Sequence, residues 1–63
     1  MNKRTLQGLR ADKHMSQDDL AKVVNLDRAT IQRYESFKSL PNVKTAQEIA
    51  NYFGMAVEDI RWF

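Results

Sequence analysis

The chain has 63 residues, of which 43% are hydrophobic and 29% charged, and its ten Lys and Arg against eight Asp and Glu give a net charge of +2. This composition is typical of one soluble globular domain over residues 1–63, and so short a chain buries only about 60% of its unfolded surface. The absence of cysteine excludes disulfides and thiolate metal sites, and no apolar run approaches the roughly 18 residues of a membrane span, so we expect a cytoplasmic protein without metal or cofactor.

A first helix is expected over about residues 3–13. Leu6 and Leu9 share one face, and Lys13 lies near the carboxyl end, where a cation favours the helix dipole. Gly8 costs about 1 kcal/mol relative to alanine, so this helix is the least self-sufficient one.

Residues 16–36 predict two short helices around a three-residue turn. Ser16 and Asp19 form the Ser-x-x-Asp pattern of a capping box, and apolar residues then recur at helical spacing. At Asn25 the pattern breaks, because asparagine tolerates the left-handed conformation that ends a helix. Asp27 is a suitable N-cap for the helix that follows.

This second helix, over about residues 28–36, has two distinct faces. Ile31 and Tyr34 share the apolar face. The opposite face carries Arg28, Ala29, Gln32, Arg33 and Ser36. A short helix with a polar outer face after a tight turn indicates a helix-turn-helix, whose second helix can enter the major groove of B-DNA.

The remaining chain predicts a loop and two further helices. Pro41 cannot continue a helix and Asn42 can cap the next one, over about residues 43–53, which Gly54 ends. A final short helix is expected from about residue 57. Chain ends are normally polar, so the apolar pair Trp62 and Phe63 either folds back on the core or contributes to a partner surface.

The order of residue types resembles that of the lambda-repressor-like, Cro/C1-type (XRE family) DNA-binding domains. The motif positions that match are Gln17, Ala21, Leu26, Ile31 and Glu35, and further matches are Leu9-Arg10, Pro41-Asn42-Val43-x-Thr45, Ile49-Ala50, Phe53-Gly54 and Val57-Glu58-Asp59-Ile60. Several short matches at the correct mutual spacing make a specific signal. The resemblance covers nearly the whole chain and implies an all-α, compact fold of five helices, with the helix-turn-helix at the second and third.

The resemblance also implies an ion pair between Arg10 and Glu35, the alternative being two separate solvated charges. The sequence departs from the family at Phe37. Family members usually have a glycine in the left-handed conformation at this position, directly after the second helix of the motif, which is called the recognition helix. Because a bulky residue resists positive φ, we expect a different local path, with Phe37 covering the core edge or lying in an oligomer contact. Ala56 stands where the family has a Ser or Thr cap, so the last helix is expected to fray.

The function that this resemblance implies is sequence-specific binding of double-stranded DNA by a prokaryotic or phage transcription regulator, which we expect to be a repressor. Base contacts are expected from Arg28, Ala29, Gln32 and Arg33. Arginine can donate two hydrogen bonds to guanine, glutamine can bracket adenine, and an alanine methyl can meet a thymine methyl.

Phosphate contacts are expected from Gln17, Ser36, Lys38 and Lys44, with Gln17 assigned by the resemblance and the lysines by position and charge. The alternative for each lysine is a merely solvated charge. One small domain gives a small interface, so we expect a homodimer on a two-fold-symmetric operator. Its surface is expected to include Phe37, Ile60, Trp62 and Phe63, for which core packing is the competing role.

An enzyme is not expected, because the chain lacks a nucleophile–base set, a glycine-rich phosphate loop and a metal-ligand cluster. The competing function is a protein-interaction module, such as an antitoxin, antirepressor or adaptor, that binds a protein through the Trp62 end. The basic, polar face of residues 28–33 argues against this as the sole function, because the core of a protein-binding surface is richer in aromatic residues.

Overall fold

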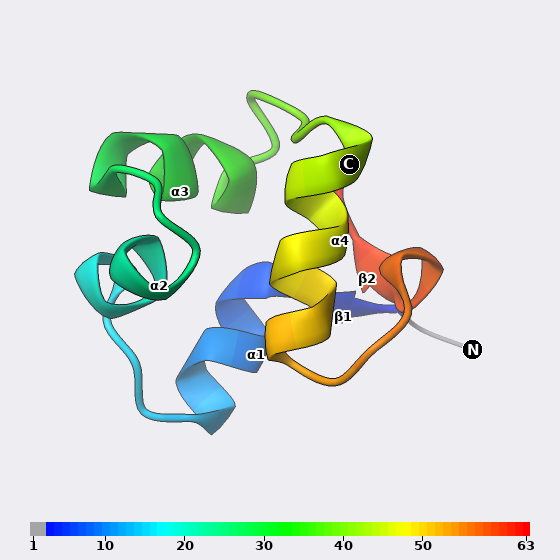
Figure 1. The fold of residues 1–63 in the computed structure, drawn as a ribbon, viewed down its shortest axis with the longest axis horizontal. Coiled ribbons are helices and arrows are strands. Elements are labelled where there is room, and N and C mark those ends of the chain that lie inside the picture. Colours follow the sequence, from blue (N-terminus) through cyan, green and yellow to red (C-terminus); the bar gives the residue numbers. More distant parts are fainter. Residues whose placement is uncertain (1–2) are drawn as a thin grey trace.

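The computed structural model describes residues 3–63, so the first two residues of the domain expected over 1–63 lie outside the described residues. Figure 1 shows the elements, which in chain order are β1 (Arg4–Thr5), α1 (Leu6–Asp12), α2 (Gln17–Val23), α3 (Arg28–Glu35), α4 (Val43–Tyr52), the 3-10 turn η1 (Val57–Asp59) and β2 (Ile60–Arg61). They pack into a body of 29 × 24 × 19 Å with a Cα radius of gyration of 10.4 Å.

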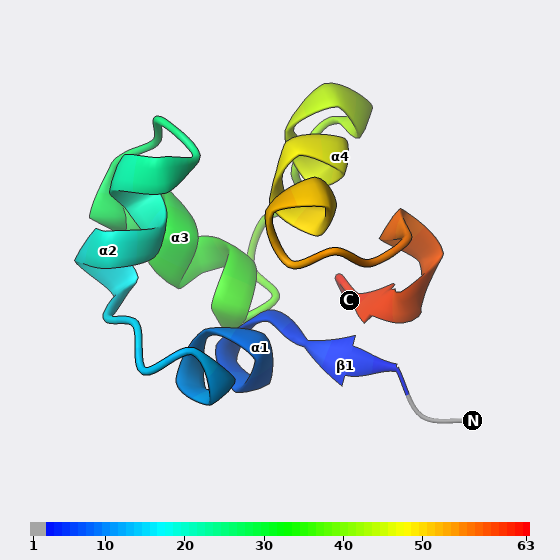
Figure 2. The ribbon, with the colours of Figure 1, turned by 60° about the horizontal axis from the view of Figure 1, so that its bottom comes forward.

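The expectation of five helices is wrong, because the described residues form four α-helices. The segment expected as a fifth helix makes a single 3-10 turn, which Ala56 precedes without a side-chain cap. The chain then extends as β2 and pairs in parallel with β1, Arg4 opposite Ile60 and Thr5 opposite Arg61. Figure 2 shows this closure of the two ends below α4. The fold is therefore mostly helical rather than all-α, and α1 begins at Leu6 because the residues before it belong to the sheet.

Each of the four α-helices in residues 3–63 begins with a side chain that accepts a hydrogen bond from the backbone N–H three residues further on. The caps are Thr5, Ser16, Asp27 and Asn42. At Ser16 the bond is reciprocal, because the Asp19 carboxylate accepts from the Ser16 N–H at 3.0 Å. These bonds satisfy N–H groups that have no partner inside the helix. The caps predicted at Ser16, Asp27 and Asn42 are confirmed.

The same four helices end in the same way, with one residue at positive φ. These residues are His14, Asn25, Phe37 and Gly54, with φ of 56°, 59°, 63° and 68°. After each of them the chain donates a backbone hydrogen bond to a carbonyl five residues back, as from Leu26 to Ala21 at 2.8 Å. This is the Schellman motif, which satisfies the last carbonyls of a helix.

Phe37 therefore adopts the left-handed conformation, and the expectation of a different local path is wrong. Lys38 N–H donates to the Arg33 carbonyl at 3.0 Å and Phe37 N–H to the Tyr34 carbonyl at 3.2 Å, which completes the motif. A non-glycine residue in this conformation costs roughly 1–2 kcal/mol. The ring is 42% exposed, so it does not recover that cost by full burial.

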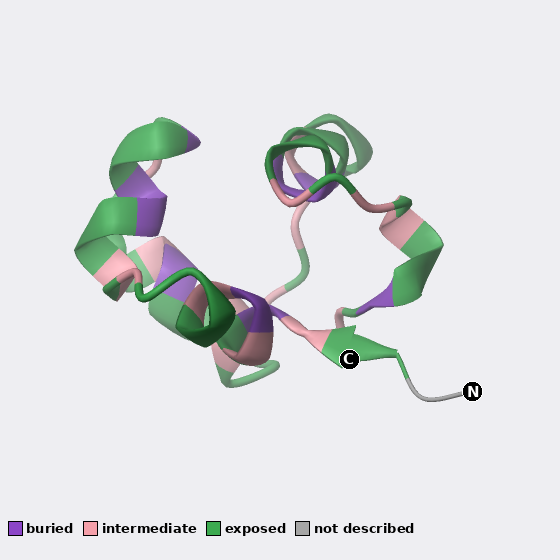
Figure 3. Cartoon of the chain, turned by 90° about the horizontal axis from the view of Figure 1, so that it is seen from below, coloured by how far each residue is buried: buried purple, intermediate pink, exposed green. Residues whose placement is uncertain are grey.

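Most of the buried apolar side chains of residues 3–63 form two clusters. The larger consists of Leu6, Leu20, Ala21, Val24, Ile31 and Ile49, and the smaller of Leu9, Ala50 and Ile60. Phe53 and Trp62 pack against both clusters and so join them. Figure 3 shows buried segments on several helices that turn toward the interior of the molecule.

Ile60 is fully buried, so it packs in the core and does not belong to an exposed dimer surface. The competing role of core packing therefore holds for this residue. The sheet fixes its position, since the backbone of Ile60 pairs with Arg4 while its side chain packs with Leu9 and Ala50. No helix within residues 3–63 is long and apolar enough to span a membrane.

Candidate nucleic-acid interface

The helix pair α2 and α3 presents α3 along one edge of the molecule (Figure 1). Leu20 of α2 and Ile31 of α3 are fully buried in the same cluster, and Leu26 from the turn packs against it. Asn25 takes the predicted left-handed conformation, which reverses the chain, and Asp27 then caps α3 with a 2.8 Å bond from the Thr30 N–H. The buried side of α3 thus fixes which side faces outward.

The four residues expected to contact bases lie together on this outward face. Arg28, Ala29, Gln32 and Arg33 are all exposed, whereas Ile31 on the opposite side is buried. The Arg33 guanidinium approaches the Thr30 hydroxyl at 3.5 Å, one turn back on the same helix. The face combines two guanidinium groups, a carboxamide and a methyl group, which is a set able to distinguish base edges. The contacts themselves stay predictions.

The expected phosphate-binding residues are less uniform. Lys38 and Lys44 are exposed, the first just beyond α3 and the second in the first turn of α4. The Ser36 hydroxyl donates back to the Gln32 carbonyl at 2.9 Å. A hydroxyl has one proton, so Ser36 has to break this bond before it can donate to a phosphate.

Arg10 and Glu35 form a two-bond ion pair between α1 and the end of α3. The Nε–Oε2 distance is 2.7 Å and the Nη2–Oε1 distance is 3.0 Å. The side chains are only 15% and 6% exposed, respectively. Arg10 Nη1 also donates to the Met15 carbonyl at 2.8 Å, so the same guanidinium holds the connection into α2. The hydrogen bond with Glu35 raises the pKa of Arg10 above its ordinary value.

Gln17 connects this ion pair to the outward face. Its carboxamide nitrogen donates to Glu35 Oε1 at 3.1 Å, and its oxygen accepts from Arg28 Nε at 3.5 Å. The amide has two protons, so one remains for a phosphate oxygen. Sequence reasoning missed the bonds of Gln17 to Glu35 and Arg28. The only available signal was the residue type, because a glutamine carboxamide offers both a donor and an acceptor at the end of a long side chain.

The sequence is also matched by a family model described as Helix-turn-helix, over residues 6–60. The chain belongs to this helix-turn-helix family. The resemblance to Cro/C1-type domains is thereby confirmed, and the match spans all four α-helices and the 3-10 turn of the described residues.

Similar helix-turn-helix proteins come from archaea and bacteria. An uncharacterized HTH-type transcriptional regulator of Methanocaldococcus jannaschii is 41% identical over 58 residues, which cover 92% of this chain and 88% of that protein. Another from Archaeoglobus fulgidus is 40% identical over 55 residues, covering 87% and 78%. The HTH-type transcriptional activator BcrR of Enterococcus faecalis is 31% identical over 55 residues, but this chain covers only 27% of it. DNA binding in transcription regulation is the class of function that these similarities support.

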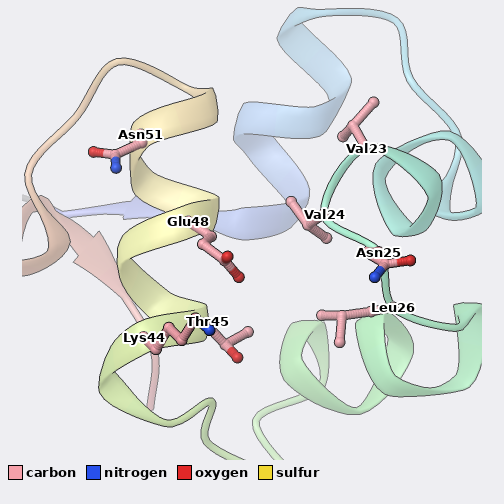
Figure 4. Close-up of a pocket in the computed structure, with 8 residues that line it drawn as sticks. All are labelled: Val23, Val24, Asn25, Leu26, Lys44, Thr45, Glu48 and Asn51. Atoms are coloured by element: carbon pink, nitrogen blue, oxygen red, sulfur yellow. The ribbon is translucent and has the colours of Figure 1, made fainter.

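A concave region lies beside the helix-turn-helix, and Figure 4 shows the residues that line it. A hollow of about 500 Å³ lies between the end of α2, the turn and α4. Val24 and Leu26 line one side of it, and Lys44 and Glu48 of α4 line the other. Within residues 3–63, no three His, Cys, Asp or Glu side chains gather in a way that would hold a metal ion.

The N-cap of α3 predicts a pH dependence of stability. Hydrogen bonds from the Thr30 side chain and backbone N–H lower the pKa of Asp27, and those from Ser16 lower the pKa of Asp19. A lowered folded-state pKa stabilises the fold above the unfolded value of about 3.9, and this contribution disappears as the pH falls through the folded value. We expect the melting temperature to fall with pH below about pH 4, and to fall less steeply in Asp27→Asn, because asparagine caps a helix without titrating.

Circular dichroism melting curves between about pH 2 and pH 6 measure this difference in slope. Asp18→Asn is the matched control, since Asp18 is an exposed residue in the first turn of α2. Equal acid-side slopes for Asp27→Asn and the unaltered chain would contradict a role for the Asp27 carboxylate.

Proposed function

We propose that this chain is a sequence-specific double-stranded DNA-binding regulator of transcription that reads base edges with the outward face of α3. The observation that carries the proposal is the exposed row of Arg28, Ala29, Gln32 and Arg33 on a helix whose other side is anchored by fully buried Ile31. A helix held in this way fits the major groove, whose width matches one helix with its side chains.

The groups around α3 favour binding to the two phosphate walls of that groove. Gln17 begins α2 beside Arg28, and Lys38 lies in the turn just after α3. Lys44 lies in the first turn of α4, whose free N–H groups and dipole also attract an anion. Backbone contacts of this kind fix the register of the protein on DNA, whereas the base contacts specify the sequence.

The proposed regulator acts in the cytoplasm as a homodimer on a two-fold-symmetric site with half-sites about one helical turn apart. The candidate dimer surface is a hollow of about 210 Å³ lined by Leu40, Pro41, Val43, Ala46, Val57, Trp62 and Phe63. Val43 and Phe63 are 75% and 79% exposed, so apolar side chains surround it. Trp62 is half-buried, and its indole N–H donates to the Val57 carbonyl at 3.0 Å, which fixes the ring beside the core.

The expected sense of regulation is repression, which follows if the operator overlaps a promoter. One similar protein is named as an activator, so the position of the site relative to the promoter decides the sense. A reporter gene with the selected site placed between its promoter elements measures this directly. Higher expression in the presence of the protein would contradict repression.

Selection of bound duplexes from a randomised pool tests the proposed function. The winning duplex and a scrambled one are then titrated across a salt series. We expect an inverted repeat, a steep salt dependence on both duplexes, and binding to the winner that is tighter by at least about a thousandfold. Equal weak binding to every duplex would instead favour the protein-interaction module, for which the apolar hollow at the Trp62 end is the candidate surface.

A further inference from the structure

The side chain of Phe37 is not explained by the turn that it occupies. The Schellman motif after α3 requires a positive φ, for which glycine carries no steric cost. Phe37 instead places an aromatic ring there, and the ring stays 42% exposed. Strained residues that persist at a surface point to a role of the side chain itself.

Arg61 supplies the contact that this ring makes. The Arg61 guanidinium carbon lies 5.0 Å from the centre of the Phe37 ring, a cation–π distance. Arg61 Nε donates to the Phe63 carbonyl at 3.1 Å, and the Arg61 backbone is paired with Thr5 in the sheet. The ring, the carbonyl and the sheet thus fix the head of an exposed arginine. Its four terminal N–H groups remain available, because a guanidinium has five donors.

The Arg61 guanidinium lies near residues that are expected to contact DNA phosphates. Phe37 lies between Ser36 and Lys38, directly after the recognition helix. The residues after Arg61 lie beside the loop between α3 and α4, since Trp62 and Phe63 line a hollow together with Leu40 of that loop. Arg61 therefore reaches, from the other end of the chain, the loop that joins α3 to the amino end of α4.

We propose that Arg61 is an additional phosphate-binding residue and that Phe37 is the platform that holds it in place. This inference rests on the proposed function and extends its DNA contact beyond the helix-turn-helix to β2. A planar guanidinium can bind a phosphate with two parallel hydrogen bonds, and an aromatic face beneath it reduces the entropy lost on binding. Lys38 and Arg61 together place two cations beside the end of α3.

Salt-dependent binding measures this contact. Each phosphate contact contributes about 0.9 to the slope of log affinity against log salt concentration. In fluorescence anisotropy titrations, Arg61→Gln is expected to reduce the magnitude of that slope by about one for each bound protomer, or by about two for the proposed homodimer. It is also expected to weaken binding to selected and scrambled duplexes by the same factor. Phe37→Gly is expected to weaken binding in the same manner while raising the melting temperature, because glycine relieves the left-handed strain. A structural defect would instead lower both the affinity for DNA and the melting temperature.

Lys13→Ala is the matched control, because Lys13 is also an exposed cation over an aromatic ring, 5.7 Å from the centre of Tyr52. Figure 1 shows the ends of α1 and α4, which carry this pair, away from α3. We expect its slope to match that of the unaltered chain.

Two results would overturn the proposal. One is an Arg61→Gln slope equal to that of the unaltered chain. The other is a lower mass for Arg61→Gln in sedimentation equilibrium, together with an unchanged salt slope of binding at protein concentrations high enough to restore the dimer. That result would assign Arg61 to a contact between two copies of the chain. Failure of the unaltered chain to bind any duplex would refute the proposed function together with this inference, so the two failures are distinguishable.

Discussion

Replacing Glu35 by leucine is expected to lower the free energy of unfolding by about 3 kcal/mol, the usual cost of breaking a largely buried ion pair. The substitution leaves the Arg10 guanidinium, which is 15% exposed, without its charged partner. Arginine cannot escape this cost by losing its proton. The Glu35→Leu substitution also removes the carboxylate oxygen that accepts a hydrogen bond from the Gln17 amide. Urea unfolding followed by circular dichroism at low temperature measures the loss.

A double-mutant cycle separates the coupling of the pair from the cost of each substitution. Arg10→Met and Glu35→Leu are expected to be less destabilising together than the sum of the two, because the double variant has no unpaired buried charge. Additive losses would show that the two side chains are not coupled. Ser36→Ala, which alters the neighbouring residue without touching the pair, is the matched control for the end of α3.

Replacing Arg28 by alanine is expected to weaken binding to the selected duplex by about 1–3 kcal/mol, or roughly five- to 160-fold, with little effect on scrambled DNA. The reason is that an arginine bidentate to guanine supplies sequence information that a phosphate contact lacks. Arg28 is the residue to test because Gln17 orients its guanidinium at the amino end of α3. Competition titrations of the two duplexes at one salt concentration measure the ratio.

Lys22→Ala is the control for this experiment, since it removes one exposed positive charge from α2 and leaves the outward face of α3 intact. A similar loss on both duplexes for Arg28→Ala would reassign Arg28 as a phosphate contact. An unchanged affinity for the selected duplex would remove it from the interface altogether.

The parts of the fold that could be predicted from sequence are those set by neighbouring residues. Ser16, Asp27 and Asn42 cap helices because their side chains reach N–H groups three residues away, so their roles can be read from local order. The helical spacing of Ile31 against Ala29 and Arg33, each about half a turn away, likewise predicts which face of α3 is exposed. The outward face of the candidate site follows from that spacing alone.

The parts that could not be predicted depend on contacts between distant residues. Two-residue strands such as β1 and β2 show no period, so nothing in residues 57–61 distinguishes an extended pair from a helical turn. Phe37 adopts a conformation that its residue type disfavours, because the Schellman hydrogen bonds at the end of α3 outweigh that preference. The Gln17 bonds depend on how α1, α2 and α3 meet, which residue spacing does not encode.

The sheet also has a consequence for how the chain folds and opens. β1 and β2 join residues more than about fifty apart, and closing such a loop costs a few kcal/mol of chain entropy, whereas α2 and α3 meet across a short turn. The helix pair is therefore free to form early, and the strands close last. The same order in reverse makes the sheet the first cooperative unit to open. When the sheet opens, Trp62 and Phe63 leave the hollow and Arg61 leaves the Phe37 ring while α3 stays folded. We therefore expect amide exchange at Ile60 and Arg61 to be faster than at Ile31.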